Sequence, residues 1–409
     1  MTNYLKLLGK SSLVMALVFT SCSSDDDNST DDDSSSAVTN TEFIATYATI
    51  AATNYNDSYT SAVSLQTAVN AFLETPSEET LEAARDAWLY ARDFYGQTEA
   101  FREANGPIDN EELLATEGQI NAWPLDEGYI DYVSTGDGET VQNGIIGDET
   151  FELTEENLIN NNETPNDDSI SVGWHAIEFL LWGQDLNYDE ETGNYDDFSG
   201  SGERPFTDYT IEENADRRSI YLQIVTDLLV NDLKDLSDTW EDGGSYRVTF
   251  ENLEEETALT NILNGIGFIS NGEVALERID PAIDEGQENE HSCFSDNTNQ
   301  DMWANVNGIN NVIQGSYTSL NGTVITGTSL IDLVAVQNET TSDDLETAAD
   351  NTLSKLDVLL GLDKNFDEIV SEETLGSGGP AGELSSALKN QGTAIADAAS
   401  ELGISITIN

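Results

Sequence analysis

The chain is poor in basic residues. Its 409 residues include 14 lysines and arginines against 79 aspartates and glutamates, which gives a formal net charge of −65 at pH 7. Contacts with nucleic-acid phosphates rely on Lys and Arg, so the composition disfavours nucleic-acid binding. It disfavours attraction to anionic lipid head groups for the same reason. A strongly negative potential attracts cations, although solubility in salty surroundings explains the same excess of acids.

The sequence also lacks a long hydrophobic run. The N-terminal apolar stretch, residues 11–19, is too short for a permanent transmembrane helix, which needs roughly 20 apolar residues. Lys6 and Lys10 precede this stretch, and small residues lead from it to Cys22, as in bacterial lipoprotein cleavage sites. We therefore expect residues 1–21 to be a signal peptide and Cys22 to be lipidated. An ordinary secretory peptide with an incidental cysteine is the alternative.

Residues 22–40 are predicted to form an acidic tether. Ser23–Ser36 contains only Ser, Asp, Asn and Thr, a composition typical of solvated segments. Acidic residues directly after a lipidated cysteine also resemble the surface-export signal of some bacterial lipoproteins. We expect an exported protein that contacts the outer membrane through its lipid alone and faces either the cell surface or the periplasm. With Cys22 lipidated, Cys293 has no disulfide partner, so the core must hold the fold.

Helical periodicity dominates the chain beyond the tether. In Thr41–Leu73, apolar residues recur at three- and four-residue steps, as one buried helix stripe requires. Similar patterns predict helices at residues 77–101, 170–183, 211–240, 253–283, 298–317, 342–360 and 381–402. Residues 108–154 are predicted to be short helices and loops, and the acidic residues 185–208 to be a loop without regular structure.

The length of the chain sets the expected number of domains. The part beyond the tether exceeds what one compact core usually holds, so two domains are expected. Long helices joined by short turns favour bundles. We predict an all-α fold of two packed helical bundles, residues 41–210 and 211–409, with the irregular residues 108–208 near their interface. Helices can be exchanged between the bundles across this boundary.

Histidine is scarce, with two in the chain. His175 and Glu178 are three residues apart in a predicted helix, so their imidazole and carboxylate lie on one face and can converge on one cation. Gly173 leaves room near the pair for a neighbouring backbone or a ligand. Spacing alone is weak evidence for a metal site, because His175 and Glu178 can equally pair with each other in a packed core.

The surroundings of this pair resemble the signature helix of the imelysin family, which includes iron-regulated bacterial surface and periplasmic proteins. The resemblance lies in Gly173-x-His175-x-x-Glu178 followed by Phe-Leu-Leu-Trp-Gly. Three further stretches are similar to the same family, at residues 87–109, 123–132 and 290–298. The four stretches span most of the chain in the expected order. Asn299 is a departure, since many members have histidine there.

The resemblance implies a two-domain all-α fold with a site at the domain interface, centred on the His-x-x-Glu helix. Related iron-uptake proteins are thought to bind metal there with carboxylates that correspond to Glu99 and Asp126. One imidazole and three carboxylates suit iron, zinc or manganese, in a divalent or ferric state, better than calcium. Either carboxylate can instead be an ordinary surface acid. Trp123, from a matching stretch, is expected to line the site with Gly173.

Further side chains are candidates for lining the site. Arg102, one turn from Glu99, can clamp a carboxylate of a ligand or neutralise the acids of the site itself. The stretch from His291 to Asp296 contains residue types found at nucleophilic sites, but catalytic triads are assembled in space and not by sequence. Ser295 and Asp296 can equally cap the next helix. A structural or site-lining role is expected for His291, Ser295 and Asp296.

Two functions follow from these observations. The favoured one is a lipoprotein that binds a metal ion, with iron expected, or an iron-containing ligand, and delivers it to an outer- or inner-membrane transporter. The alternative is a metal-dependent peptidase, because the family has been classed with metallopeptidases. In that case His175 and Glu178 would be metal ligands and Glu99 or another carboxylate the base. The His-Glu-x-x-His motif is absent, which ranks this alternative second. A scaffold or carbohydrate-binding module whose site is now only structural is a third possibility.

Overall fold

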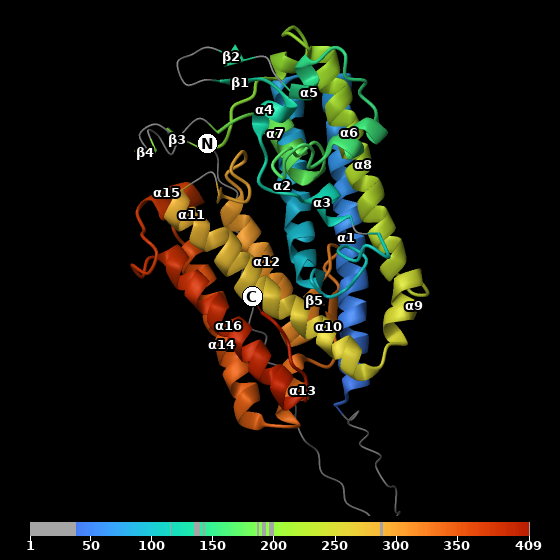
Figure 1. Cartoon of the computed structure of the whole chain (residues 1–409), viewed down its shortest axis with the longest axis vertical. Helices are drawn as coiled ribbons and strands as arrows, with labels where there is room; N and C mark the ends of the chain where they lie inside the picture. The colour runs from blue at the N-terminus through green and yellow to red at the C-terminus, as the bar shows by residue number, and fades with distance from the viewer. Residues whose placement is uncertain are drawn as a thin grey trace, which may run out of the picture. The chain divides into compact units, whose positions relative to one another are not determined.

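Helices make up most of the described residues in this computed structural model (Figure 1). The structure describes residues 38–114, 116–134, 140–141, 144–185, 188–189, 194–195, 200–286 and 289–408. These residues confirm the predicted all-α fold class, because their strands form only short two-stranded pairs. No described helix is long and apolar enough to cross a membrane. The predicted signal peptide, Cys22 and most of the tether lie outside the described residues.

The elements differ widely in length. The longer helices are α1 (Asn40–Glu74), α2 (Glu78–Thr98), α7 (Gly173–Trp182), α8 (Ala215–Trp240), α10 (Glu255–Phe268), η3 (Ile269–Ile279), α12 (Thr298–Gln314), α14 (Glu339–Leu360) and α16 (Pro380–Glu401). The shorter ones are η1 (Glu99–Phe101), α3 (Glu117–Ile120), α4 (Glu127–Ile130), α5 (Gly144–Gly147), α6 (Glu155–Asn161), η2 (Phe206–Tyr209), α9 (Ser245–Glu251), α11 (Asp280–Glu285), α13 (Leu330–Ala335) and α15 (Phe366–Ser371). Antiparallel pairs join β1 (Val133–Ser134) to β2 (Thr140–Val141), β3 (Tyr188–Asp189) to β4 (Asn194–Tyr195) and β5 (Ser316–Thr318) to β6 (Val324–Thr326).

The first two helices begin where capping side chains predict. The Thr39 side chain accepts a hydrogen bond from the Glu42 N–H and caps α1. The Ser77 side chain and Thr80 form a reciprocal capping box at the start of α2. The predicted helix at residues 41–73 is confirmed to within one residue at each end, and the one at 77–101 continues through α2 into η1.

Helices that are distant in sequence pack side by side (Figure 1). The helix α1 packs against α2 and α8, and α14 packs against α16, while α12 contacts both α2 and α14. The helix α8 follows the predicted boundary at residue 210, yet it packs against α1 and α7 from before that boundary. The described residues belong to one compact unit that begins at Val38. The division into domains of residues 41–210 and 211–409 stays a prediction.

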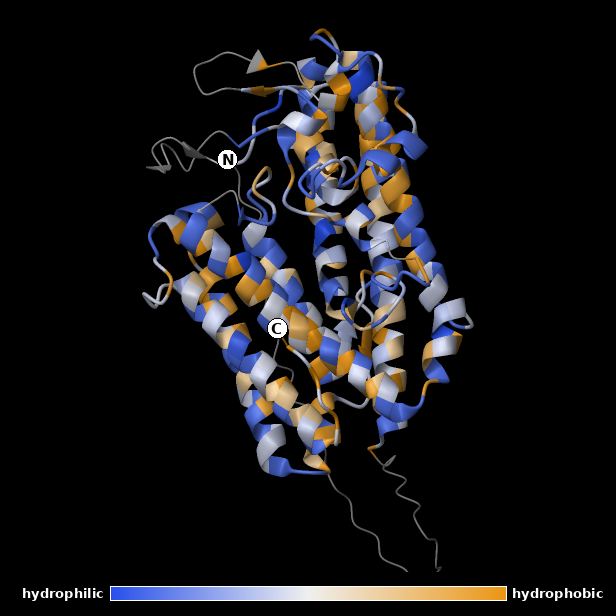
Figure 2. Cartoon of the chain, in the orientation of Figure 1, coloured by the Kyte–Doolittle hydropathy of each residue, from blue (hydrophilic) through white to orange (hydrophobic). Residues whose placement is uncertain are grey.

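Each long helix buries one face. Figure 2 shows hydrophilic and hydrophobic residues alternating around the long helices, as expected for helices with one buried stripe. Where α1 meets α8, the Trp240 ring packs against Tyr47 and Tyr55, with centroids 6.2 and 6.4 Å away. Such aromatic pairs add about 0.5–1.5 kcal/mol beyond the burial of their area. This packing fixes α8 against α1.

The predicted helix at residues 253–283 is a continuous run of α10, η3 and α11, and η3 has π-helical geometry. A close helix contact occurs at Gly265, where an added Cβ would lie 2.6 Å from the Arg102 backbone oxygen. Because Gly265 has no side chain, α10 approaches the end of η1. Two side chains of η3, Glu273 and Arg278, contact Arg102 or Glu99 there.

The helix α7 begins at a residue that must be glycine. Gly173 has a φ of +89°, and an added Cβ would lie 2.5 Å from the Ile120 backbone oxygen. Glycine alone adopts this backbone region without steric cost. The sequence left open whether a neighbouring backbone or a ligand fills the space beside Gly173. In the structure the backbone of Ile120 fills it.

Replacing Gly173 with alanine should lower the free energy of unfolding by about 2–4 kcal/mol, because left-handed strain adds to the contact with Ile120. Urea denaturation followed by circular dichroism measures this loss. Gly403→Ala is the matched control, since Gly403 has a φ of +78° and nothing within 4 Å of an added Cβ. We expect about 1 kcal/mol for the control. Equal losses in the two variants would mean that the contact with Ile120 contributes nothing.

Other segments differ from the sequence prediction. Residues 185–208 were predicted to lack regular structure, but they contain the β3–β4 pair and η2. The short helices α13 and α15 and the β5–β6 pair were not predicted. These elements are two to six residues long, so their hydrophobic pattern is too short to identify.

Candidate functional site

His175 and Glu178 contact each other on α7. The Nδ1 atom of His175 lies 2.8 Å from Oε2 of Glu178, and both side chains are fully buried. The other carboxylate oxygen of Glu178 accepts hydrogen bonds from the Ser295 backbone N–H at 3.0 Å and from its hydroxyl at 2.7 Å. The structure therefore shows the direct pairing that the spacing left open, and it places Ser295 at the site.

Burial governs the charge of this pair. Burial, together with Arg92, lowers the pKa of His175 well below its ordinary value, so the imidazole is neutral at pH 7. Burial raises the pKa of Glu178 to about 8 against the opposing hydrogen bonds from Ser295. The Nε2 atom of His175 is buried and has no hydrogen-bond partner. An unsatisfied buried polar atom is costly, so Nε2 is the atom that a ligand can satisfy.

The second histidine faces the first. The ring centroids of His175 and His291 are 5.0 Å apart, and the Trp123 ring lies 4.8 Å from His175. The Nδ1 atom of His291 lies 3.2 Å from Asp301 and 3.4 Å from Arg92. Burial, followed by Arg278 and Arg92, lowers the pKa of His291 well below its ordinary value. Two neutral imidazoles thus meet beside an indole ring, and the roles of His291 and Trp123 as lining residues of a metal site stay predictions.

Glu99 is buried in a network of its own. Its Oε2 atom accepts a hydrogen bond from Arg278 at 2.5 Å, and its Oε1 atom accepts one from the Asn121 amide at 3.3 Å. Burial raises the pKa of Glu99, but Arg278 and His291 outweigh burial and lower it below its ordinary value. Glu99 is therefore an ionised carboxylate that is already paired with an arginine.

Arg102 neutralises neighbouring acids. Its guanidinium lies 3.2 Å from Glu273, 3.4 Å from Glu117 and 3.9 Å from Glu99. Burial lowers the pKa of Arg102, but these carboxylates outweigh burial and raise it. These ion pairs fit the second of the two roles that the sequence left open, neutralising the acids of the site, and the clamping of a ligand by Arg102 stays a prediction.

Asp126 lies at the start of α4, and its side chain is exposed. Its Oδ1 atom accepts a hydrogen bond from the Gly128 N–H at 3.0 Å and caps the helix. Among the described residues, the ligand atoms of the four predicted metal ligands, His175, Glu178, Glu99 and Asp126, do not all lie within 4.8 Å of one another. The four-residue metal set stays a prediction, and the structure brings only His175 and Glu178 of that set into contact.

A hollow of about 310 Å³ opens beside His291. It is lined by Arg102, Arg278, Trp123, His291 and four glutamates, with Asn121, Ala122, Pro124 and Asn289. The glutamates are Glu117, Glu163, Glu273 and Glu277. Burial raises the pKa of Glu117, whereas Arg278 and Arg102 outweigh burial at Glu273 and lower its pKa to about 2. The hollow therefore offers both arginine donors and carboxylate acceptors next to the buried histidines.

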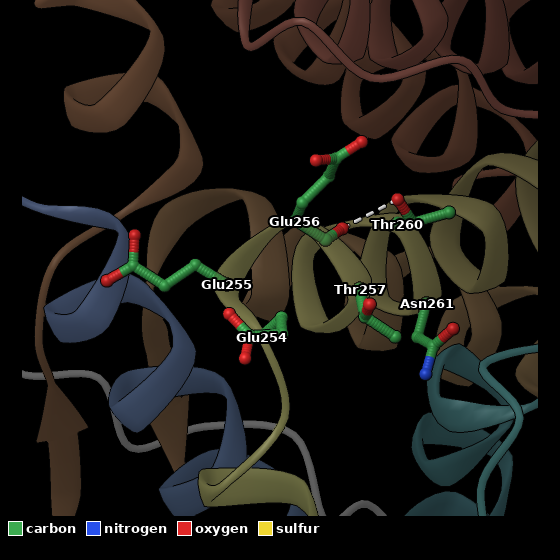
Figure 3. A pocket seen from close by; sticks show the side chains of 6 residues that line it. All are labelled: Glu254, Glu255, Glu256, Thr257, Thr260 and Asn261. Atoms are coloured by element: carbon green, nitrogen blue, oxygen red, sulfur yellow. Dashed lines mark hydrogen bonds between the residues drawn. The ribbon is translucent and has the colours of Figure 1, made fainter.

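A second hollow, of about 840 Å³, lies at the start of α10 (Figure 3). Its lining side chains come from that single helix start, namely Glu254, Glu255, Glu256, Thr257, Thr260 and Asn261. The three glutamates are exposed, and Glu255 accepts a hydrogen bond from the Thr41 hydroxyl at 2.7 Å. Water satisfies such exposed acids, so the hollow beside His291 is the better candidate site.

Sequence reasoning missed several residues of the site. Arg92 donates to Asp301 and to Asn121, and Arg278 pairs with Glu99. The scarcity of arginine was a usable signal, since the chain has eight, and three of them lie here. No local pattern links η3 or α12 to the His-x-x-Glu helix, because the contacts are tertiary.

Comparison with known proteins agrees with the four matching stretches. The Imelysin family model matches residues 51–376. The chain is 42% identical to iron-regulated protein A of Synechococcus elongatus over 65 residues, which cover 16% of this chain and 17% of that protein. The chain thus aligns with about a sixth of the length of this curated relative.

Two solved structures share the fold. A structure described as an iron-regulated protein A precursor from Parabacteroides distasonis has a TM-score of 0.67 at 19% identity, with 90% of this chain and 97% of that chain covered. An imelysin-like protein from Psychrobacter arcticum has a TM-score of 0.56 at 16% identity, with 89% and 97% covered. The resemblance that the sequence predicted is confirmed, and the chain belongs to the imelysin family.

Proposed function

We propose that this protein binds a transition-metal ion through His175, that iron is the favoured ion, and that the protein serves in iron acquisition. One observation carries the proposal: Nε2 of His175 is buried and has no hydrogen-bond partner, while Glu178 holds the opposite ring nitrogen. Two of the similar proteins bear names that contain iron-regulated, which supports iron as the first choice.

The pairing with Glu178 suits a metal-binding histidine. A metal-ligating imidazole usually donates its other N–H to a carboxylate, which fixes the tautomer and directs the free lone pair at the metal. Glu178 lies 2.8 Å from Nδ1 of His175, and Ser295 holds the carboxylate in place. In this role the ionised Glu178 orients the ligand His175, and because burial raises the pKa of Glu178 to about 8, binding of the ion would release the Glu178 proton at pH 7. The depressed pKa of His175 keeps the imidazole in the neutral form that binds metals.

The position of His291 suits a second ligand. A metal–nitrogen distance of about 2.1 Å puts each ring centre about 3 Å from the ion, and two such rings in tetrahedral geometry lie about 5 Å apart. The rings of His175 and His291 are 5.0 Å apart. Water or a chelating ligand in the adjacent hollow would supply the other donors, and Arg102 and Arg278 there suit an anionic chelate.

Elemental analysis and calorimetric titration of untagged protein with Fe²⁺, Zn²⁺ and Mn²⁺ test the proposal. We expect one tightly bound ion, and an affinity loss of at least about 100-fold in His175→Ala, because a ligand is removed. Glu178→Gln keeps the shape of the pair and should weaken binding by about 10- to 100-fold. Unchanged affinity in a folded His175→Ala variant would exclude this site.

Asp126→Asn examines the ligand that the family resemblance implies. The Asp126 carboxylate is exposed and caps α4, so we expect an unchanged metal affinity. Asp343→Asn, at an exposed position of α14, controls for the loss of one charge. A selective loss of affinity in Asp126→Asn would add Asp126 to the ligands.

The peptidase alternative makes a different prediction. A hydrolytic site needs a free carboxylate base near the metal. Both oxygens of Glu178 are engaged, and Glu99 is paired with Arg278, whose charge contributes to the lowered pKa that makes Glu99 a poor base. Chelator-sensitive cleavage of an unfolded protein that disappears in Glu178→Gln would favour the peptidase over the binding protein.

The location and the delivery partner are part of the same proposal. An exported, lipid-anchored protein that holds iron at the outer membrane would deliver it to a membrane transporter. Radiolabelled palmitate in the membrane fraction of cells that express the chain, and its loss in Cys22→Ser, would test the anchor.

A further inference from the structure

Three aspartates from distant parts of the chain meet outside the histidine site. Asp185 follows α7, Asp296 precedes α12, and Asp367 lies in α15. One carboxylate oxygen from each lies within 4.8 Å of the corresponding oxygens of the other two. Three like charges at this separation repel one another strongly, so the cluster requires protons or a cation.

Two oxygens of this cluster, one of Asp296 and one of Asp367, have no partner in the described part of the protein. The Oδ1 atom of Asp296 and the Oδ2 atom of Asp367 are buried and have no hydrogen-bond partner. Among the ion pairs of the described residues, none involves Asp296 or Asp367. The other oxygen of Asp296 accepts a hydrogen bond from the Asn365 amide at 2.7 Å, which orients the carboxylate.

A fourth carboxyl group points to a ligand independently. Glu290 is 1% exposed, and its Oε2 atom has no hydrogen-bond partner. The three aspartates interact electrostatically with Glu290. Glu290 thus lies close to the three aspartates without belonging to their group. An unsatisfied buried carboxyl oxygen is costly, and a cation among the four acids would satisfy it.

We propose that Asp185, Asp296 and Asp367 bind a calcium ion, with Glu290 as a nearby acid that strengthens the site. The donors are all oxygens, which suits a hard cation and does not suit the softer metals that prefer imidazole. A calcium shell has a radius of about 2.4 Å, so its ligand oxygens lie at most about 4.8 Å apart, as these three do.

The ion would join three segments of the chain, two of which already meet through the hydrogen bond from Asn365 to Asp296. The residue before Asp296 is Ser295, which holds Glu178 at the histidine site. Calcium at the three aspartates would therefore fix the segment that presents Ser295 to Glu178. The calcium site is distinct from the transition-metal site, because it uses neither His175 nor His291.

Thermal unfolding and calorimetry of chelator-treated full-length protein test the proposal with CaCl₂ and MgCl₂ as probes. We expect one calcium ion per chain and a melting temperature that rises by several degrees with calcium, more than with equal magnesium. Asp367→Asn removes a repelling charge at nearly constant shape. It should melt at the same or a higher temperature than the parent without calcium, and it should lose the calcium-induced rise.

Control variants separate this site from surface binding and from the histidine site. Asp343→Asn, an exposed change of equal charge on α14, should keep the full calcium response. His175→Ala should keep it as well, even if that variant loses its transition metal. The proposal is wrong if the parent shows neither a heat of calcium binding nor a rise in melting temperature at millimolar calcium. It is also wrong if Asp367→Asn and Asp296→Asn respond to calcium like the parent.

Discussion

Replacing Arg278 with methionine is expected to lower the free energy of unfolding by about 3–5 kcal/mol, the cost of leaving a buried charge without its partner. Arg278 lies 2.5 Å from Oε2 of Glu99, and Glu99 is fully inaccessible to solvent. Arg278 also donates to Glu273 at 2.6 Å and to Asn305 at 2.9 Å. Methionine fills a similar volume but leaves Glu99 without the arginine that most lowers its pKa.

A second substitution shows whether the buried charge causes the loss. In Arg278→Met/Glu99→Gln the amide needs no counter-charge, so we expect most of the stability to return. Denaturant unfolding at pH 7 measures all four members of this cycle. Lys389→Met is the control for a partly exposed ion pair, since Lys389 pairs with Asp280 near the surface, and it should cost at most about 1 kcal/mol. A double variant no more stable than Arg278→Met would assign the loss to Glu273, Asn305 or packing instead.

The same pair bears on the role of Glu99 in metal binding. The carboxylate that the family resemblance assigned to the metal is bonded to an arginine and an amide. An ion that recruited Glu99 would have to displace Arg278 from it. The metal affinity of a folded Arg278→Met variant therefore shows whether the ion and Arg278 compete for Glu99. Increased affinity would indicate that Glu99 is a metal ligand, and unchanged affinity would indicate that it is a structural carboxylate.

The sequence predicted the helices well because their signals are local. The stripe of Thr41–Leu73 and the cap at Ser77 depend on residues within a few positions, and α1 and α2 begin where these signals lie. The contact of His175 with Glu178 follows from a spacing of three residues on one helix. Elements of two to six residues, such as β3 and α15, carry too few positions for a period to be recognised.

The rest of the site depends on tertiary packing. Arg278 is 179 residues from Glu99, and Ser295 is 117 residues from Glu178, so no spacing rule links either pair. Gly265 permits the close approach of α10 to Arg102, but a glycine in a helix pattern does not reveal its neighbour. The family resemblance supplied His291 and Ser295 as candidates, and the fold brought both to α7. It also supplied Asp126, which the fold leaves exposed.

The free energy of unfolding is expected to fall as the pH rises from 5 to 8. Burial raises the pKa of Asp232, Asp109 and Asp93 to about 6. The folded state then keeps protons that the unfolded state has lost, so this stabilisation is complete below the unfolded pKa and disappears as the pH passes the folded pKa. His175 and His291 have lowered pKa values in the folded state, so they raise the free energy of unfolding as the pH rises toward their unfolded pKa.

Asp232→Asn removes the contribution of one acid to the pH dependence of the free energy of unfolding. Asp232 is 8% exposed and accepts a hydrogen bond from Gln119 at 2.8 Å, which an asparagine oxygen can also accept. A shift of two pKa units corresponds to about 3 kcal/mol. Because the loss begins at the unfolded pKa of about 4, urea titrations should show Asp232→Asn more stable than the parent by about 1.5 kcal/mol at pH 5 and by up to about 3 kcal/mol at pH 8. The exposed Asp343→Asn should show no such difference. If Asp232→Asn kept the pH dependence of the parent, the Asp232 carboxyl would have to ionise in the folded protein as it does in the unfolded chain.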